Sequence, residues 1–257
     1  MELATITTMT LDNISTAEMN VRQDLAACYR LFVRYGWTDL IFTHLSARAP
    51  GQTDQYLINP YGLLFEEITA SSLVKINFAG DLISGTNSYS DAGHAIHSAV
   101  LKARPDVNFV LHSHTRAGMA VSCMQCGILP LTQQANEISS LIAYHPYGGI
   151  PPNDPEECNR IGRSLGDKWL MVLHNHGLLA VGRTIGEAFY LLYYLEIACK
   201  VQIDVLKAKV DTVQPPKNVM EILAKHGQPP KKNTLKDAEI LWGTLVRSLR
   251  NDTSYKK

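Results

Sequence analysis

Apolar residues recur every three or four positions near the start of the chain, as they do along the buried face of a helix. The sequence predicts a helix that Ser15 or Thr16 caps and that ends at Gly36. A second helix is predicted from Thr184, because Glu187 follows three residues later in the spacing of a capping box. The core-facing stripes of the two helices are Val21, Leu25, Cys28, Leu31, Phe32 and Tyr35, and Ala188, Leu191, Leu195, Ala198, Val201 and Val205.

Short apolar runs bounded by Pro, Gly and Asn predict strands between these two helices. The pattern over 92–103 predicts a helix, and 118–126 has a helical pattern too. Residues 127–130 are expected to be extended, and 146–155, rich in Pro and Gly, to form a loop. The predicted strands are 56–59, 73–77, 107–111, 169–173 and 178–181.

Two proline pairs, Pro215-Pro216 and Pro229-Pro230, divide the C-terminal part of the chain into two short predicted helices, over 219–225 and from about Thr234. The second has an apolar stripe of Leu235, Ala238, Leu241, Trp242, Leu245 and Leu249. This stripe must pack on the domain or on a neighbouring subunit. The predicted organisation is a polar leader over 1–15, one α/β domain over 16–209 and a helical C-terminal extension over 210–257.

Composition excludes some partners. The 257 residues are 46% apolar and 19% charged, which is ordinary for a globular protein. Because 24 basic residues balance 24 acidic ones, no net field attracts nucleic acid or an anionic membrane. No signal peptide or membrane span is recognisable. The five cysteines are scattered and odd in number, which indicates reduced thiols, and we therefore expect a cytoplasmic protein.

Two histidine pairs stand at the ends of predicted strands. His112 and His114 are two residues apart, so both imidazoles can project from one face of a strand. This spacing alone is also common at polar strand ends. His174 and His176 end the later strand, where Gly177 permits a sharp turn. Because zinc and Fe(II) bind neutral imidazoles, the pairs together predict a metal site of His112, His114 and His176, with His174 as a less favoured fourth ligand.

Several motifs occur in a characteristic order along the chain. They are Gly36-Trp37-Thr38-Asp39-Leu40, Ile58-Asn59-Pro60-Tyr61-Gly62-Leu63-Leu64, Thr69-Ala70-Ser71-Ser72-Leu73-Val74-Lys75-Ile76, Ala103-Arg104-Pro105-Asp106-Val107, His112-Ser113-His114-Thr115 and His176-Gly177-Leu178. With them the chain from about Ala17 to Lys207 resembles the class II aldolase and adducin family. Residues 71–76 and 119–127 are closer to the adducin head domain and its bacterial relatives.

The resemblance implies a three-layer α/β/α fold around a mostly antiparallel sheet. It also implies a cyclic homotetramer with the site near a subunit interface, and zinc bound by His112, His114 and His176. The stripe on the last predicted helix gives a physical reason to expect association of subunits.

The chain departs from the sugar-phosphate aldolases of the family at several positions. Gly93 stands where those enzymes have a glutamate that serves as metal ligand and as proton-transfer base. His44, Tyr61 and Asp91 stand where they bind the substrate phosphate. A carboxylate at Asp91 would repel a phosphate dianion, so a sugar-phosphate substrate is disfavoured.

Other side chains become candidates for the missing base. His94 ranks first because it follows Gly93, His97 lies one helical turn further, and Tyr144 and His145 belong to a later segment. For each, a structural role is the alternative. The candidates for substrate binding, with Arg116 as a partner for a carboxylate, are His44, Asn59, Tyr61, Gly62, Asp91 and Arg116.

The sequence favours a metal-dependent lyase that cleaves or decarboxylates a small, non-phosphorylated carbonyl or carboxylic acid through an enolate. Zinc is the expected metal, with Fe, Mn or Co as alternatives, and Fe(II) would suit oxidative decarboxylation. A non-catalytic, adducin-like interaction module is the other interpretation. Cys123 and Cys126 have redox or zinc spacing, but they fall in a predicted helix without a second pair, and core packing is predicted for them.

Overall fold

The computed structural model describes residues 14–85, 88–146, 154–213, 215–226 and 232–257. Their strands form one sheet in the order β4-β3-β2-β1-β5-β8-β7-β6, antiparallel except for the β6 and β7 pair. The strands are β1 (Leu45–Arg48), β2 (Gln55–Ile58), β3 (Val74–Asn77), β4 (Leu82–Ser84), β5 (Phe109–Ser113), β6 (Ile142–His145), β7 (Leu170–Leu173) and β8 (Gly177–Gly182).

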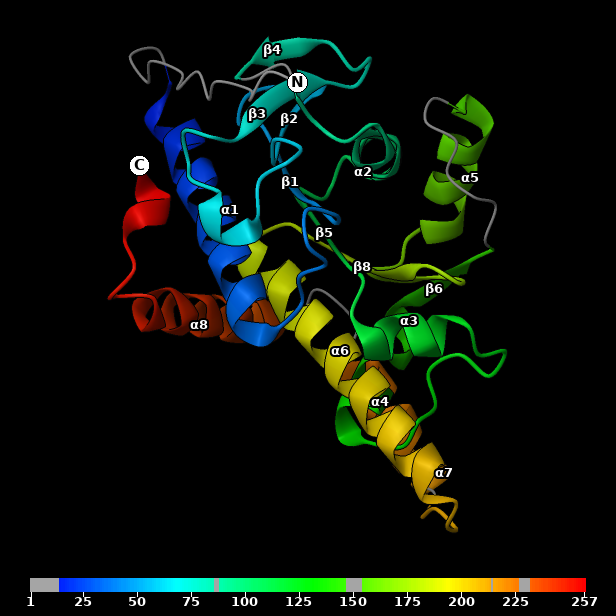
Figure 1. The fold of residues 1–257 in the computed structure, drawn as a ribbon. Coiled ribbons are helices and arrows are strands. Elements are labelled where there is room, and N and C mark those ends of the chain that lie inside the picture. Colours follow the sequence, from blue (N-terminus) through cyan, green and yellow to red (C-terminus); the bar gives the residue numbers. More distant parts are fainter. Residues whose placement is uncertain (1–13, 86–87, 147–153, 214, 227–231) are drawn as a thin grey trace.

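Helices cover both faces of this sheet. Helices α1, α6 and α8 lie on one side, and α2 and α5 on the other (Figure 1). The three-layer α/β/α fold with a mostly antiparallel sheet is thereby confirmed. The helices are α1 (Thr16–Tyr35), α2 (Asp91–Ala103), α3 (Arg116–Ser122), α4 (Gln133–Ile138), α5 (Pro155–Leu165), α6 (Ile185–Ala208), α7 (Lys217–His226) and α8 (Lys232–Ser248), with short 3-10 helices η2 (Phe65–Glu67), η3 (Ser139–Leu141) and η4 (Ser254–Lys256).

The two predicted long helices begin at their predicted caps, and the first ends at Gly36 as predicted. Ser15 Oγ accepts a hydrogen bond from the backbone of α1, and Gly36 ends that helix with a φ of 67°. Thr184 Oγ1 accepts from the Glu187 N–H at the start of α6. The capping box is only half formed, because the Glu187 carboxylate accepts from the backbone N–H of Arg183 instead of that of Thr184.

Several elements were not predicted from the sequence. Strands β1 and β4 are four and three residues long and lack a clear alternation. Helices α4 and α5 are mostly polar and were missed, as was β6. The predicted loop over 146–155 ends earlier than expected, since α5 begins at Pro155, and 147–153 lie outside the described residues. Of the predicted leader over 1–15, the structure describes residues 14 and 15.

The segment 118–130 also differs from its prediction. Helix α3 ends at Ser122, and no strand is assigned to 127–130. Cys123 and Cys126 therefore follow the helix in a turn, and both are exposed instead of packed in the core.

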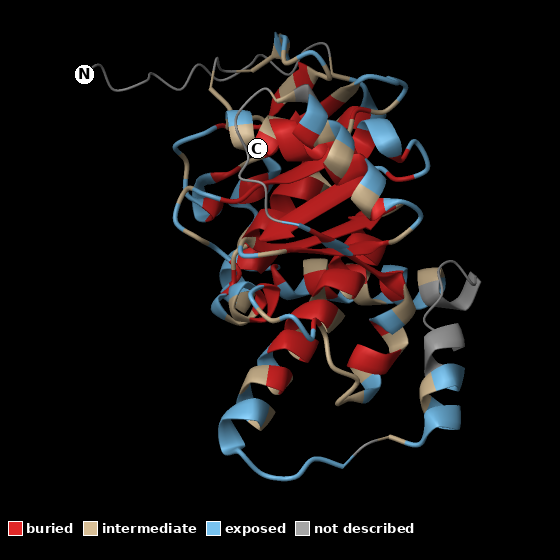
Figure 2. Ribbon diagram, turned by 90° about the vertical axis from the view of Figure 1, so that its right-hand side faces the viewer, coloured by how far each residue is buried: buried red, intermediate tan, exposed pale blue. Residues whose placement is uncertain are grey.

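The C-terminal stripe packs against its own chain. Ala238, Trp242 and Leu245 of α8 are buried, as is Leu249 directly after it, and α8 packs against α6. The stripe is thus no argument for subunit association, and the predicted oligomer must use another surface. The core itself consists of the sheet and the inner faces of the helices, while residues 217–222 of α7 and the end of α6 are largely exposed (Figure 2).

Among the described residues, no helix combines the length and the apolar character that crossing a membrane would need.

Candidate metal centre

The three predicted metal ligands meet at the end of strands β5 and β8. His112 is the fourth residue of β5, and His114 lies just beyond its end. His176 lies in the turn between β7 and β8, where Asn175 has a φ of 56°. The antiparallel register pairs His112 with Leu179, so the turn that carries His176 lies beside the end of β5. Adjacent strands therefore bring together residues more than sixty positions apart.

Gly177 allows this close approach. A Cβ atom there would collide with the backbone oxygen of Ser113 and would lie 2.9 Å from His114 Cδ2. Any larger residue would separate the β7 to β8 turn from β5.

The three imidazoles face one another. Their ring centroids are 4.6 Å apart for His112 and His114, 4.9 Å for His112 and His176, and 4.7 Å for His114 and His176. One nitrogen from each ring lies within 4.8 Å of the others. This spacing fits a single divalent ion with three imidazole ligands, which commonly leaves one coordination position open.

Hydrogen bonds to the outer ring nitrogens orient two of the ligands. His112 Nδ1 lies 2.8 Å from the backbone oxygen of Leu178, and His114 Nδ1 lies 3.0 Å from an oxygen of Asp39. Both contacts place the proton on Nδ1 and leave Nε2 with its lone pair toward the cluster. Asp39 was not a predicted site residue, although it belongs to a recognised motif.

Burial keeps the rings of His112 and His176 neutral. It lowers the pKa of His112 well below its usual range, and the nearby His114 and His176 lower it further. Burial is also the main cause that lowers the pKa of His176, to about 4. Neutral imidazoles are the form that binds a metal ion.

A buried glutamate accepts hydrogen bonds from the residues on either side of His114. Glu196 of α6 is 0% exposed, and its two carboxylate oxygens accept hydrogen bonds of 2.6 Å from Ser113 and 2.7 Å from Thr115. Burial raises the pKa of this carboxyl, while the two hydroxyls act in the opposite direction. Nothing in the sequence pointed to Glu196, because it lies more than eighty residues after Ser113 and Thr115.

A cavity of about 260 Å³ opens beside the histidine cluster. Its lining includes His114 and His176, and of the predicted substrate-binding residues it includes His44 and Tyr61. Among the described residues, no lysine or arginine lines it. The site is therefore small and has no fixed cation to neutralise a phosphate.

The other predicted substrate-binding residues are not part of this lining. Asn59 is buried and accepts a hydrogen bond of 2.8 Å from the hydroxyl of Tyr29. Gly62, Asp91 and Arg116 are exposed residues outside the cavity wall.

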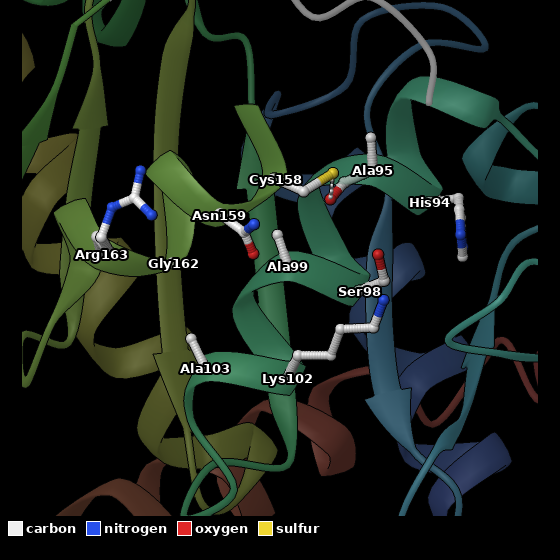
Figure 3. Close-up of a pocket in the computed structure, with 10 residues that line it drawn as sticks. All are labelled: His94, Ala95, Ser98, Ala99, Lys102, Ala103, Cys158, Asn159, Gly162 and Arg163. Carbon is white, nitrogen blue, oxygen red and sulfur yellow. Dashed lines mark hydrogen bonds between the residues drawn. The ribbon is translucent and has the colours of Figure 1, made fainter. Parts of the chain in front are cut away.

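His94, the first-ranked base candidate, belongs to a different cavity. That larger space of about 590 Å³ lies between α2 and α5, with His94 at one end and Arg163 at the other (Figure 3). The Nδ1 atom of His94 lies 2.7 Å from the hydroxyl of Tyr56. His94 directly follows Gly93, so its side chain is rotated by about 100° around α2 relative to position 93 and lies away from the histidine cluster.

Tyr144 and His145 also have structural partners. The Tyr144 hydroxyl accepts a hydrogen bond of 3.0 Å from the backbone of Ile128. His145 is buried between Ser164 and Glu157, with contacts of 2.9 Å to each. Neither residue lines the cavity at the cluster.

Comparison with known proteins decides the family. Residues 23–203 match the family described as the Class II Aldolase and Adducin N-terminal domain. The chain belongs to this family. An aldolase II superfamily protein from Pseudomonas syringae is similar in structure, with a TM-score of 0.89 and 41% identity over 96% of this chain and 98% of that one. An L-fuculose 1-phosphate aldolase from Glaciozyma antarctica has a TM-score of 0.81 and 27% identity, covering 95% and 96% of the two chains.

The family also contains adducins. Mouse alpha-adducin is 45% identical to this chain over 193 residues, which are 74% of this chain and 26% of the adducin. The family therefore includes proteins named as aldolases and proteins named as adducins, and membership alone does not assign an activity to this chain.

Proposed function

We propose that this member of the class II aldolase family is a metal-dependent lyase that cleaves or decarboxylates a small, non-phosphorylated carbonyl compound or carboxylic acid. The observation that supports it most is the convergence of His112, His114 and His176 beside an open cavity. A module without chemistry has no need for three converging imidazoles with two of them oriented by hydrogen bonds.

A divalent ion held by these histidines would polarise a carbonyl oxygen and stabilise the negative charge of an enolate. The protein supplies the positions of the ligands, through Asp39 and the backbone of Leu178, and a cavity that limits the size of the substrate. Zinc is the proposed ion because it takes three histidines readily; Fe, Mn or Co are the alternatives.

The cavity supports a substrate without a phosphate group. A phosphate dianion usually meets Lys, Arg or a helix N-terminus in its site. No lysine or arginine is among the described lining residues, and the N-terminus of α2, which borders the cavity at Ser90 and Ala92, carries the acidic Asp91. The 260 Å³ volume is also small for a ligand pocket. A small carbonyl or carboxylic acid fits both features.

The adducin-like interaction module remains the second candidate, favoured by the 45% identity to alpha-adducin. The domain boundaries, a cytoplasmic location and a homotetramer stay proposals, as does oxidative decarboxylation should the metal be iron.

Elemental analysis of protein purified without added metal tests the proposal. We expect about one zinc ion per chain, and the His112→Ala and His176→Ala variants should lose it, because three ligands are needed for tight binding. His174→Ala is the matched control: it removes a neighbouring imidazole outside the cluster, and it should keep the metal.

Metal-free wild-type protein that also fails to take up added zinc would contradict the proposal and favour the interaction module. With metal confirmed, cleavage or decarboxylation should be measured on small hydroxy-carbonyl compounds and 2-oxo acids. Turnover should disappear in His176→Ala and persist in His174→Ala.

A further inference from the structure

Two neighbouring side chains in the wall of the cavity have unused hydrogen-bonding capacity. Thr43 is 2% exposed, and its Oγ1 has no hydrogen-bond partner among the described residues. Its φ of 69° is rare for a β-branched residue. His44 follows it and lines the same cavity, with no recorded partner for its Nε2 among those residues. Buried polar groups are normally paired, so these two indicate a place for a ligand atom.

A chain of buried, hydrogen-bonded groups orients the His44 ring. Its Nδ1 lies 2.9 Å from Nε2 of His97 on α2, and Nδ1 of His97 contacts the hydroxyl of Ser46. Ser46 is the second residue of β1, two positions after His44, and both side chains contact His97. All three side chains are buried, and the chain ends in the core at Ser46.

The hydroxyl of Ser46 sets the direction of these hydrogen bonds. Within the described part of the chain, His97 is its one recorded partner, and Ser46 is 0% exposed. The Ser46 O–H must therefore donate to His97 Nδ1, since any other orientation leaves a buried donor unpaired. His97 then carries its proton on Nε2 and donates to His44 Nδ1. His44 in turn carries its proton on Nε2, as a donor toward the cavity.

Gly93 makes room for this arrangement. A Cβ atom at position 93 would lie 2.7 Å from Cδ2 and 3.1 Å from Nε2 of His44. The His44 ring therefore takes the space that a side chain on the first turn of α2 would need. It also stacks on the ligand His112, with centroids 5.2 Å apart. The donor edge of His44 is thus next to the metal cluster.

We propose that Thr43 and His44 form a subsite that binds one anionic substrate oxygen, of a carboxylate or an enolate, through the Thr43 hydroxyl and the Nε2–H of His44. Ser46 and His97 are positioning residues that fix His44 in this tautomer. The inference deepens the proposed function and rests on it for the identity of the substrate. It involves no proton transfer: two neutral donors stabilise an oxygen on which negative charge develops.

The ring tautomer can be read directly by NMR. Long-range proton–nitrogen spectra of labelled protein should show His44 protonated on Nε2, with the signals assigned by their loss in His44→Phe. Ser46→Ala should produce a mixture of the two tautomers, since the fixed donor is gone. Ser98→Ala is the control, because it removes a buried hydroxyl directly after His97 that points into the other cavity, and it should leave the spectrum unchanged.

Ligand binding tests the subsite itself. Oxalate, a small planar dianion that resembles the enolate of a 2-oxo acid, should bind zinc-loaded wild-type protein in a calorimeter. Thr43→Val and His44→Phe, which keep the side-chain size, should each weaken oxalate about 10- to 100-fold, the effect of losing a hydrogen bond to a charged group. Ser98→Ala should bind like the wild type.

The two experiments separate the possible failures. Protonation of His44 on Nδ1, or a Ser46→Ala spectrum identical to that of the wild type, would overturn the tautomer assignment with or without metal. Unchanged oxalate affinity in Thr43→Val and His44→Phe, in samples with wild-type zinc content and circular dichroism, would overturn the subsite while the proposed function stands. Failure of the wild-type protein to bind zinc would overturn the proposed function. The tautomer spectrum would still decide the role of Ser46.

Discussion

His112 and His114 each depend on a contact that their own neighbours in the sequence do not reveal. Strand alternation was enough to predict that His112 and His114 share a face, and the second pair supplied His176. Asp39 and Glu196 were not predictable, since each comes from an element distant in the sequence. Proximity to Gly93 in the sequence did not show which candidate base lies near the cluster: His94 lines the other cavity, whereas His97 contacts His44, which lines the cavity at the cluster.

At this scale we expect Glu196 to stabilise the metal-binding segment. Glu196→Ala leaves the buried hydroxyls of Ser113 and Thr115 without their acceptor, and the free energy of unfolding should fall by about 2 to 4 kcal/mol. Zinc affinity should fall as well, because His114 lies between these two residues. Urea unfolding and zinc titration measure the two effects. The control is Asp204→Asn at an exposed position of the same helix, which should change the stability little. An effect of Glu196→Ala no larger than that of the control would refute the prediction.

His97 should make the metal-free protein sensitive to mild acid. Burial lowers its pKa to about 3, whereas the unfolded chain titrates near 6.5, so between these values the unfolded state binds more protons. Stability from His97 is therefore complete above about pH 6.5 and falls with decreasing pH, by up to about 1.4 kcal/mol per pH unit. In urea unfolding between about pH 5 and pH 6.5, His97→Gln should flatten this dependence. Ser98→Ala, which removes no titrating group, should retain the wild-type slope.

Among the elements, strong periodicity was predictive and short or polar segments were not. Helices α1 and α6 followed from their stripes and caps, whereas β1 and β4 are short, lack such signals and form because the sheet supplies their partners. Helix α5 was missed although Asp154 caps it and Pro155 begins it, because the Pro- and Gly-rich stretch before it indicates one continuous loop. The same limit applied to the C-terminal stripe: the sequence showed that it must be buried, but its partner, α6, is a matter of tertiary packing.

The contact between α6 and α8 should contribute to stability without affecting the site. A Cβ atom on Gly186 of α6 would lie 2.9 Å from Trp242 Cβ, which shows how closely the helices approach. Trp242 is 7% exposed and donates to Asp24, so Trp242→Ala should lower the free energy of unfolding by about 3 to 5 kcal/mol. Ile240→Ala, on the exposed face of α8, should cost less than about 1 kcal/mol. Zinc content should stay at one per chain in both, and loss of zinc in Trp242→Ala would contradict this separation.

For the whole molecule, the order of motifs predicted the three-layer architecture that local patterns could not supply. A mostly antiparallel sheet needs long-range pairings, such as β1 with β5, that no local period encodes. The fold brings the end of β5, the β7 to β8 turn and the residues before β1 to the same end of neighbouring strands, and the cavity lies there. The proposed chemistry depends on this convergence.

Anomalous X-ray diffraction from crystals of the zinc-loaded protein, recorded at the zinc edge, tests the convergence most directly. We predict one strong peak per chain, at about 2.0 to 2.1 Å from a nitrogen of each of His112, His114 and His176. A zinc peak at another position, such as Cys123 and Cys126, or the absence of a peak at the three histidines would contradict the account.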